Sequence, residues 1–285
     1  MAEHIRHEAV REQLRGIWIQ SAFIKFCDGE ITEQFHLDLS RVFGPLEVHR
    51  TREYLDERTP ELLKLSSSED PTEIEVDGER GGQFQSWHKD SIYFEKVNRG
   101  GMLRALKPTS RGGLTGFVDL ADAYDRLPLA LKNRIENLRI VYRMSLQDEH
   151  PYTIGEKVRV LKKSNSLAAL FDRRDRDFPP VSHPLVFTQP GSGRKVLNFS
   201  PSHAKYVEGL GREQSHELLT AIATHVYACP AYHHRWTTEE MLLWDNWRMV
   251  HMVSLQPLDE ERIMQRTTIA GDYGFGRRVL PQTVI

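Results

Sequence analysis

The spacing of apolar positions changes several times along the N-terminal part of the chain. Residues 9–14 have the spacing of a short helix, whereas residues 17–26 form an apolar run that predicts a strand. Thr32 then precedes apolar residues at helical spacing up to Phe43, and a Gly-Pro pair follows, which predicts a capped amphipathic helix. Residues 56–82 are polar and rich in turn-forming residues, so we expect a surface loop or a mobile lid there.

Short apolar segments dominate the second half of the chain. Residues 120–138 predict a helix that Pro128 interrupts, and residues 213–227 predict another. Residues 148–180 are dense in charge and predict a long connection that is functional or only partly ordered. Short strands are predicted at residues 185–188, 196–200, 241–244, 249–254 and 263–270. This pattern favours a mainly β fold with peripheral helices (α+β), an antiparallel sandwich or barrel, in a single domain over residues 1–285.

The composition narrows the class of protein. The chain has 285 residues, with 38 Lys and Arg against 40 Asp and Glu, so its formal net charge is -2. This balance removes the general electrostatic argument for nucleic acid or an anionic membrane surface as a partner. Cys27 and Cys229 are too few for a disulfide framework or a thiolate metal cage, and no apolar run approaches the ~20 residues of a membrane span. We therefore expect a cytoplasmic protein with a small-molecule partner, and a homo-oligomer stays possible.

The first candidate for chemistry is the segment from Trp87 to Asp90. If this segment is a strand, His88 and Asp90 project from the same face, because side chains alternate along a strand. An imidazole and a carboxylate placed in this way can bind one metal ion. The alternative is an ion pair on the surface of the strand.

The second candidate is His251, which follows the turn-forming pair Asp245 and Asn246 between two apolar runs. These residues predict a hairpin with His251 on its second strand. The alternative is that His251, a single histidine in an apolar run, is a core residue with no ligand role. Together with His88 and Asp90 it would complete two imidazoles and one carboxylate, the ligand pattern of non-haem Fe(II) oxygenases.

The third candidate is a pair of arginines near the C-terminus. Alternation along the predicted strand places Arg262, Met264 and Arg266 on one face. Guanidinium groups are costly in a dry core unless each has an anionic partner, and the carboxylate of a ligand would supply one. The alternative is that the arginines extend to solvent or pair with acidic side chains.

Five segments in a characteristic order carry a resemblance to a known family. They are Trp87-His-Lys-Asp, Gly112-Gly-Leu-Thr-Gly-Phe-Val-Asp, Ala123-Tyr-Asp-Arg-Leu-Pro, Trp244-Asp-Asn and Arg262-Ile-Met-Gln-Arg-Thr-Thr-Ile-Ala-Gly-Asp. Together they resemble the taurine and chlorophenoxyacetate dioxygenase (TauD/TfdA) family, which depends on Fe(II) and 2-oxoglutarate. The resemblance covers residues 10–275, and the segment from His183 to Lys195 is most similar to the chlorophenoxyacetate branch.

The resemblance implies a double-stranded β-helix, a distorted cupin-like jelly roll with helices packed outside. It also implies site residues, one position at a time. His88, Asp90 and His251 match the iron ligands of the family. Thr115 matches a hydroxyl that steadies a 2-oxoglutarate carboxylate, and Arg262 matches the arginine that binds the distal carboxylate of 2-oxoglutarate.

The prime substrate is less closely defined. Arg266 matches the position that binds the acidic group of the substrate in taurine and related dioxygenases. His203, Lys89 and Lys96 are further candidates for the substrate pocket, with solvated surface charge as the alternative. Phe84 stands where the family often has a polar residue, which argues against taurine itself.

The resemblance therefore implies a 2-oxoglutarate-dependent non-haem iron dioxygenase with O2 as the second cosubstrate. We expect it to hydroxylate or oxidatively cleave a small organic anion such as an aryloxy-carboxylate, releasing succinate and CO2. Asp90 argues against a halogenase, because the related halogenases lack this carboxylate. Two alternatives stay open: a hydroxylase of an amino-acid derivative in natural-product biosynthesis, and a metal-binding jelly roll without turnover.

Overall fold

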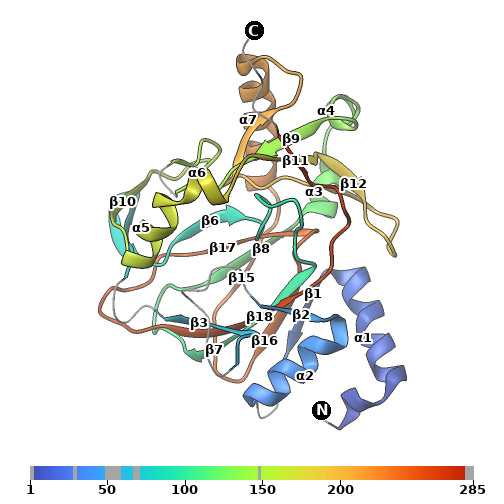
Figure 1. The fold of residues 1–285 in the computed structure, drawn as a ribbon, viewed down its shortest axis with the longest axis vertical. Helices are drawn as coiled ribbons and strands as arrows, with labels where there is room; N and C mark the ends of the chain where they lie inside the picture. Colours follow the sequence, from blue (N-terminus) through green and yellow to red (C-terminus); the bar gives the residue numbers. More distant parts are fainter. Residues whose placement is uncertain (1–2, 28–30, 49–58, 67–70, 147–148, 280–285) are drawn as a thin grey trace.

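Two antiparallel sheets lie at the centre of the molecule, one above the other in Figure 1. The computed structural model describes residues 3–27, 31–48, 59–66, 71–146 and 149–279. The larger sheet has the order β1-β16-β7-β18-β2, and β3 also pairs with β18. Its strands are β1 (Phe23–Phe26), β2 (Leu46–Glu47), β3 (Leu62–Ser66), β7 (Gly100–Lys107), β16 (Met241–Asp245) and β18 (Ile263–Ile269). The smaller sheet has the order β15-β8-β17-β6, with strands β6 (Gln85–His88), β8 (Thr115–Asp119), β15 (Tyr232–His234) and β17 (Met249–Val253).

Apolar side chains of the two sheets meet between them. Phe117 of β8 packs against Trp244 of β16 with ring centroids 5.8 Å apart, and Met249 and Met264 belong to the same buried cluster. Burying one face of each sheet against the other removes this apolar surface from water, which holds the two layers together. The predicted fold class, a mainly β jelly roll with outer helices, is confirmed.

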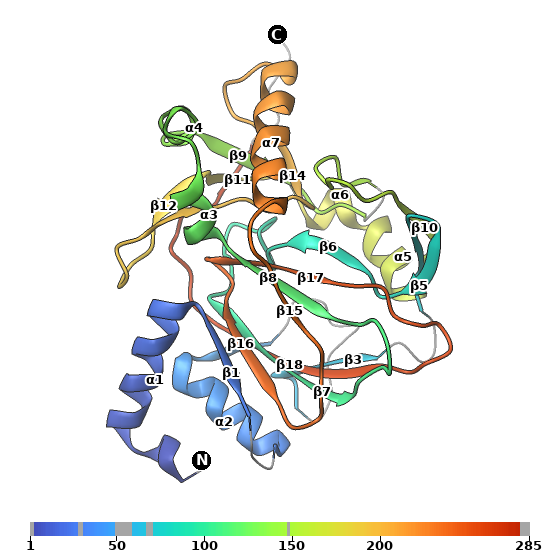
Figure 2. The same cartoon turned by 180° about the vertical axis from the view of Figure 1, so that it is seen from behind.

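Helices and small sheets cover the outside of the two central sheets (Figures 1 and 2). The helices are η1 (His4–Arg6), α1 (Glu8–Ser21), α2 (Glu33–Phe43), α3 (Leu120–Arg126), α4 (Leu129–Ile135), α5 (Asn165–Asp172), α6 (Arg174–Asp177) and α7 (Arg212–Tyr227). The outer strands are β4 (Glu73–Val76), β5 (Glu79–Gly82), β9 (Arg139–Tyr142), β10 (Val158–Lys162), β11 (Val181–Pro184), β12 (Val186–Thr188), β13 (Lys195–Leu197), β14 (Ala204–Val207) and β19 (Arg277–Arg278). Because α5 and α6 lie beside β6 and β10, they cover one end of the smaller sheet.

Several predicted elements are confirmed. Thr32 caps α2, since its side chain accepts a hydrogen bond from the backbone N–H of Phe35 at 3.1 Å. Pro128 separates α3 from α4, and α7 occupies the predicted position. The strands predicted after residue 180 are present as β12, β13, β16, β17 and β18, with ends shifted by at most three residues.

The strand predicted for residues 17–26 is wrong in its first half. Helix α1 continues to Ser21, and Ala22, with a φ of 59°, ends it before β1 begins. Trp18 lies on the buried side of this helix, where its ring meets that of Phe43 edge-on at 5.4 Å. The first half of the apolar run therefore lies on a helix. The periodicity of so short an apolar run cannot distinguish a helix from a strand.

The two segments predicted as loops contain regular structure. Within 56–82, the described residues form β3, β4 and β5, while 56–58 and 67–70 lie outside the described part of the chain. Within 148–180, β10 pairs with β4, and α5 and α6 follow. These strands are only four or five residues long and stand between turn-forming residues, so the polar composition of the two segments outweighed short signals such as the apolar start of β3 and the alternation of β4.

The predicted hairpin around Asp245 and Asn246 is wrong. Strand β16 pairs with β1 and β7 in the larger sheet, whereas β17 pairs with β6 and β8 in the smaller one. The turn therefore carries the chain from one sheet to the other. Among the described residues, no helix is both long enough and apolar enough to span a membrane.

Candidate metal centre and substrate cavity

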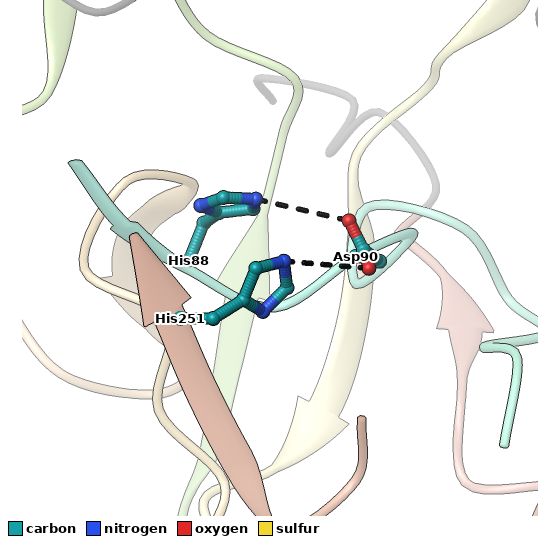
Figure 3. Close-up of side chains that lie close together, drawn as sticks. All are labelled: His88, Asp90 and His251. Carbon is teal, nitrogen blue, oxygen red and sulfur yellow. Dashed lines mark ion pairs between the residues drawn. The ribbon is translucent and has the colours of Figure 1, made fainter. Parts of the chain in front are cut away.

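His88 and His251 are direct neighbours across two paired strands. His88 ends β6, and the pairing of β6 with β17 places it opposite His251, with ring centroids 4.2 Å apart. Asp90 follows in the turn beyond the strand, so the prediction that it shares a strand face with His88 is corrected. Figure 3 shows the carboxylate facing both rings, with distances of 3.7 Å to Nε2 of His88 and 3.5 Å to Nε2 of His251. All three ligand atoms lie within 4.8 Å of one another.

The protonation of His88 suits a metal ligand. Its Nδ1 lies 2.8 Å from the carbonyl oxygen of Ser86, which can only accept a hydrogen bond, so the proton belongs on Nδ1. Nε2 then carries a lone pair on the side of Asp90. Burial, helped by the neighbouring His251, lowers the pKa of His88 to about 3, so its ring is neutral near pH 7.

Asp90 supplies the negative charge of the group. Burial acts to raise the pKa of Asp90, but Arg266 and His251 outweigh it and hold the pKa well below its ordinary value. Two imidazole nitrogens and one carboxylate oxygen are the donor set of the non-haem Fe(II) oxygenases. The residues therefore fit Fe(II), with the remaining positions open to ligands.

Asn246 holds the backbone of Asp90 in place. Its side-chain oxygen accepts a hydrogen bond from the N–H of Asp90, and its amide nitrogen donates to the carbonyl of Asp90, both at 2.9 Å. The same nitrogen lies 3.3 Å from the backbone and side-chain oxygens of Asn98. Asn246 is fully buried. The sequence indicated only a turn here, because the contact spans 156 positions and no local signal reveals it.

Solvated surface charge, the alternative for Lys89 and Lys96, is wrong for Lys89, which is buried and contributes to the lining of the cavity beside His88, and it fits Lys96. Lys89 is fully buried, and its ammonium donates to Oδ1 of Asn198 and to the carbonyl of Trp247, both at 2.6 Å. Burial lowers the pKa of Lys89 to about 7. Lys96 is exposed and does not line the cavity beside His88.

Arg266 of β18 and Arg262, which directly precedes that strand, are both buried, so the alternative that they extend to solvent is wrong, whereas the alternative of an acidic partner holds for Arg266. Nη2 of Arg266 lies 2.6 Å from Oδ2 of Asp90, and its guanidinium stacks over the ring of Trp244 at 5.0 Å. Nε of Arg266 is buried and has no hydrogen-bond partner among the described residues. Arg266 is thus an ion-pair partner of the candidate metal ligand and retains a donor for another acceptor.

Arg262 lies beside the segment that carries Thr115. Its Nη2 donates to the carbonyl of Gly113 at 3.3 Å, and burial lowers its pKa to about 10, which leaves it charged near pH 7. Gly113 has a φ of +59°, and a Cβ there would stand 3.2 Å from Nε of Arg262, so glycine suits both the turn and the approach of the arginine. Thr115 is buried, and its Oγ1 accepts a hydrogen bond from Nε1 of Trp236 at 2.9 Å.

A cavity of about 220 Å³ opens beside the metal centre. His88, Asp90, Arg266 and His203 contribute to its polar lining, and Leu167, Leu170 and Phe171 of α5 contribute apolar side chains. The structure thus places His203 in the cavity, where its ring meets that of His88 edge-on at 6.5 Å. The volume is below the roughly 300–1,000 Å³ of typical ligand pockets, so it suits a compact substrate.

Comparison with known proteins agrees with this geometry. The sequence profile of the family described as "Taurine catabolism dioxygenase TauD, TfdA family" matches residues 3–268. The (S)-phenoxypropionate/alpha-ketoglutarate-dioxygenase of Sphingobium herbicidovorans is 30% identical over 262 residues, which are 91% of this chain and 85% of that protein. The alpha-ketoglutarate-dependent 2,4-dichlorophenoxyacetate dioxygenase of Cupriavidus pinatubonensis is 29% identical over 283 residues, which are 95% of this chain and 92% of that protein.

Solved structures show the same fold. The crystal structure of a taurine dioxygenase from Burkholderia xenovorans superposes with a TM-score of 0.70 at 22% identity, covering 97% of this chain and 87% of that one. The family implies 2-oxoglutarate and O2 as cosubstrates, and both the family and the His-Asp-His group imply Fe(II). The chain therefore belongs to the TauD/TfdA family and is a 2-oxoglutarate-dependent dioxygenase.

Proposed function

We propose that His88, Asp90 and His251 hold Fe(II) and that the enzyme hydroxylates or oxidatively cleaves a small organic anion. In each turnover one oxygen atom of O2 enters succinate and the other enters the prime substrate, while 2-oxoglutarate loses CO2. The bound metal and 2-oxoglutarate supply the O2 chemistry. The observation that carries the proposal is the convergence of the three ligand atoms within 4.8 Å, beside a cavity that also holds Arg266.

Arg262 and Thr115 are the residues that we assign to 2-oxoglutarate. A carboxylate gains two parallel, charge-assisted hydrogen bonds from a guanidinium, and these bonds are stronger away from water. Arg262 is 4% exposed and charged, which meets both conditions. Thr115 already accepts from Trp236, so its own hydroxyl proton stays available to a carboxylate oxygen.

Arg266 is the residue that we assign to the acid group of the prime substrate. It lines the cavity, and its Nε lacks a partner among the described residues. An anion at this point would satisfy a buried donor whose isolation is costly. Two relatives are named for (S)-phenoxypropionate and 2,4-dichlorophenoxyacetate, which are aryloxy acids. We therefore propose an aryloxy-carboxylate or an acid of similar size.

The test measures formation of succinate that depends on the prime substrate, with Fe(II), 2-oxoglutarate and O2 present. The panel contains aryloxy acids, alkyl sulfonates and N-acyl amino acids, and we expect turnover with aryloxy acids. His88→Ala should lose both metal binding and turnover, because the site keeps only two of its three ligands. His216→Ala, which removes an exposed histidine of α7, is the matched control. A His88→Ala protein that still binds Fe(II) and forms succinate would contradict the assignment.

A further inference from the structure

Three side chains beyond the metal ligands form a hydrogen-bonded chain in the cavity wall. Oγ of Ser86 lies 2.7 Å from Nδ1 of His150 and 3.1 Å from Oγ of Ser202. All three residues line the same cavity as Arg266. Ser86 lies on β6 and Arg266 on β18, so the chain and the arginine come from different sheets. The metal-centred chemistry proposed above uses none of these three side chains.

The contacts around the chain decide where its protons lie. Nε2 of His150 stands 3.4 Å from the carbonyl of Ser145, which can only accept, so we place the imidazole proton on Nε2. Nδ1 of His150 then accepts the hydroxyl proton of Ser86. The hydroxyl of Ser202 donates to the carbonyl of Trp87 at 2.8 Å. Because the proton of Ser86 is committed to His150, the contact of 3.1 Å between the two serines requires Ser202 to share its single proton between the carbonyl of Trp87 and Oγ of Ser86. The remaining lone pair of Ser86 can only accept.

The hydrogen-bonded side chains of Ser86, His150 and Ser202 also carry no charge. Burial lowers the pKa of His150 to about 4, so its ring is neutral near pH 7. The ring of His203 lies between this chain and the metal ligands, 5.9 Å from His150 and 6.5 Å from His88. Lys205 acts on the pKa of His150 but does not line the cavity, so a second carboxylate placed against Ser86 and His150 would lose its hydration without a direct cationic partner.

We propose that Ser86, oriented by His150, forms a neutral acceptor subsite that binds a hydroxyl or N–H group of the prime substrate. The inference rests on the proposed function and adds to it the class of substrate. The preferred substrate is an organic acid whose acid group binds Arg266 and whose apolar body lies against Leu170 and Phe171 of α5. This body carries an uncharged hydrogen-bond donor at a distance from the acid group.

The acceptor of Ser86 is expected to discriminate against substrates that lack a hydrogen-bond donor. A substrate without the donor buries an acceptor of the protein that is then unpaired, at a cost of about 1–3 kcal/mol. The cost corresponds to a factor of about 5 to 150 in kcat/KM. A methyl ether at the same position would also leave the acceptor of Ser86 unpaired, because an ether oxygen can only accept.

The experiment compares phenoxyacetate, its hydroxyphenyl and methoxyphenyl derivatives, and a carboxyphenyl derivative, each substituted at matched ring positions. Succinate formation gives kcat and KM for each acid. We expect the hydroxyphenyl acid to have a kcat/KM about tenfold or more above that of the other three, mainly through KM. Equal values, or preference for the methoxy or carboxy compound, would overturn the proposal.

Variants test whether the preference for the hydroxyphenyl acid arises from the hydrogen-bonded side chains of Ser86 and His150. Ser86→Ala removes the acceptor but keeps the backbone carbonyl that orients His88, and it should bring the hydroxyphenyl preference close to one. His150→Gln is the second variant, should Ser86→Ala fold poorly. Ser145→Ala is the control, since its hydroxyl lies in the same cavity but bonds to the carbonyl of Arg143, and it should retain the preference.

Two failures are distinguishable. If no acid in the panel supports succinate formation by the wild-type enzyme, the proposed function fails together with the subsite. If all four acids turn over with similar constants, the proposed function stands and the acceptor subsite alone is refuted. A hydroxyphenyl preference that survives in Ser86→Ala also refutes the subsite. Binding of Fe(II) by each variant, measured without substrate, verifies that the metal centre is intact.

Discussion

Replacing Asn246 by alanine is expected to loosen the metal centre although no metal ligand is changed. Asn246 makes two hydrogen bonds of 2.9 Å to the backbone of Asp90, and its side chain is fully buried. Alanine would leave the N–H and the carbonyl of Asp90 without these partners. Each unpaired buried group costs about 1–3 kcal/mol, so the free energy of unfolding should fall by about 2–6 kcal/mol.

Metal affinity should fall as well, because the carboxylate of Asp90 is carried by the backbone that Asn246 fixes. Loss of a group that orients a metal ligand typically costs about 10- to 100-fold in affinity. Anaerobic titration with Fe(II) gives the metal affinity, and urea unfolding of the metal-free protein gives the stability.

Ser215→Ala is the matched control for Asn246→Ala. Oγ of Ser215 accepts a hydrogen bond of 2.7 Å from the N–H of Val207, and this serine is also buried, but it lies in α7. The control should lose stability while keeping its affinity for Fe(II). The reasoning is refuted if Asn246→Ala binds Fe(II) as tightly as the wild type, or if both variants lose affinity equally.

Three further predictions concern the arginines and a buried histidine. Arg262→Ala should raise the KM for 2-oxoglutarate by about 30-fold or more, since it removes a buried ionic contact worth at least about 2 kcal/mol; an unchanged KM would contradict the assignment. Arg266→Ala should raise the KM for the prime substrate more than that for 2-oxoglutarate, and steady-state kinetics with each varied in turn would show the reverse order if the roles are exchanged. Burial, with Arg104 nearby, lowers the pKa of His36 to about 3, so the unfolded state binds more protons between about pH 3 and 6.5 and stability falls as pH drops through this window. His36→Gln should therefore remove about 2 kcal/mol of the stability lost between pH 7 and pH 5, measured by urea unfolding at both values, and an unchanged pH slope would show that His36 is not the source.

Local chemistry explains which elements could be predicted from the sequence. A cap such as Thr32 and a helix breaker such as Pro128 act within a few residues, so the pattern places α2, α3 and α4 closely. The central strands β16 and β17 are mostly apolar, and β18 combines apolar with β-branched residues, so all three were also found. The strands within 56–82 were missed, since each has only four or five residues and turn-forming residues surround them, so the segment as a whole has the composition of a loop.

The sequence by itself determined the residue types of the metal centre and the fold class. His88, Asp90 and His251 stand out because few residue types bind a metal, and their spacing together with the neighbouring motifs resembles one family. The pairing of β6 with β17 brings His88 and His251 together, and the turn after β6 adds the carboxylate of Asp90, so that the three ligand atoms lie within 4.8 Å.

Tertiary structure alone decided which groups surround these ligands. The clamp of Asn246 on Asp90, the ion pair of Arg266 with the same residue and the contact between Ser86 and His150 join segments 64 to 176 positions apart. The turn at Asp245 and Asn246 crosses between sheets instead of closing a hairpin, and it thereby brings the amide of Asn246 to the metal centre. Such contacts depend on how two sheets pack, and packing is a property of the whole chain that no local pattern encodes.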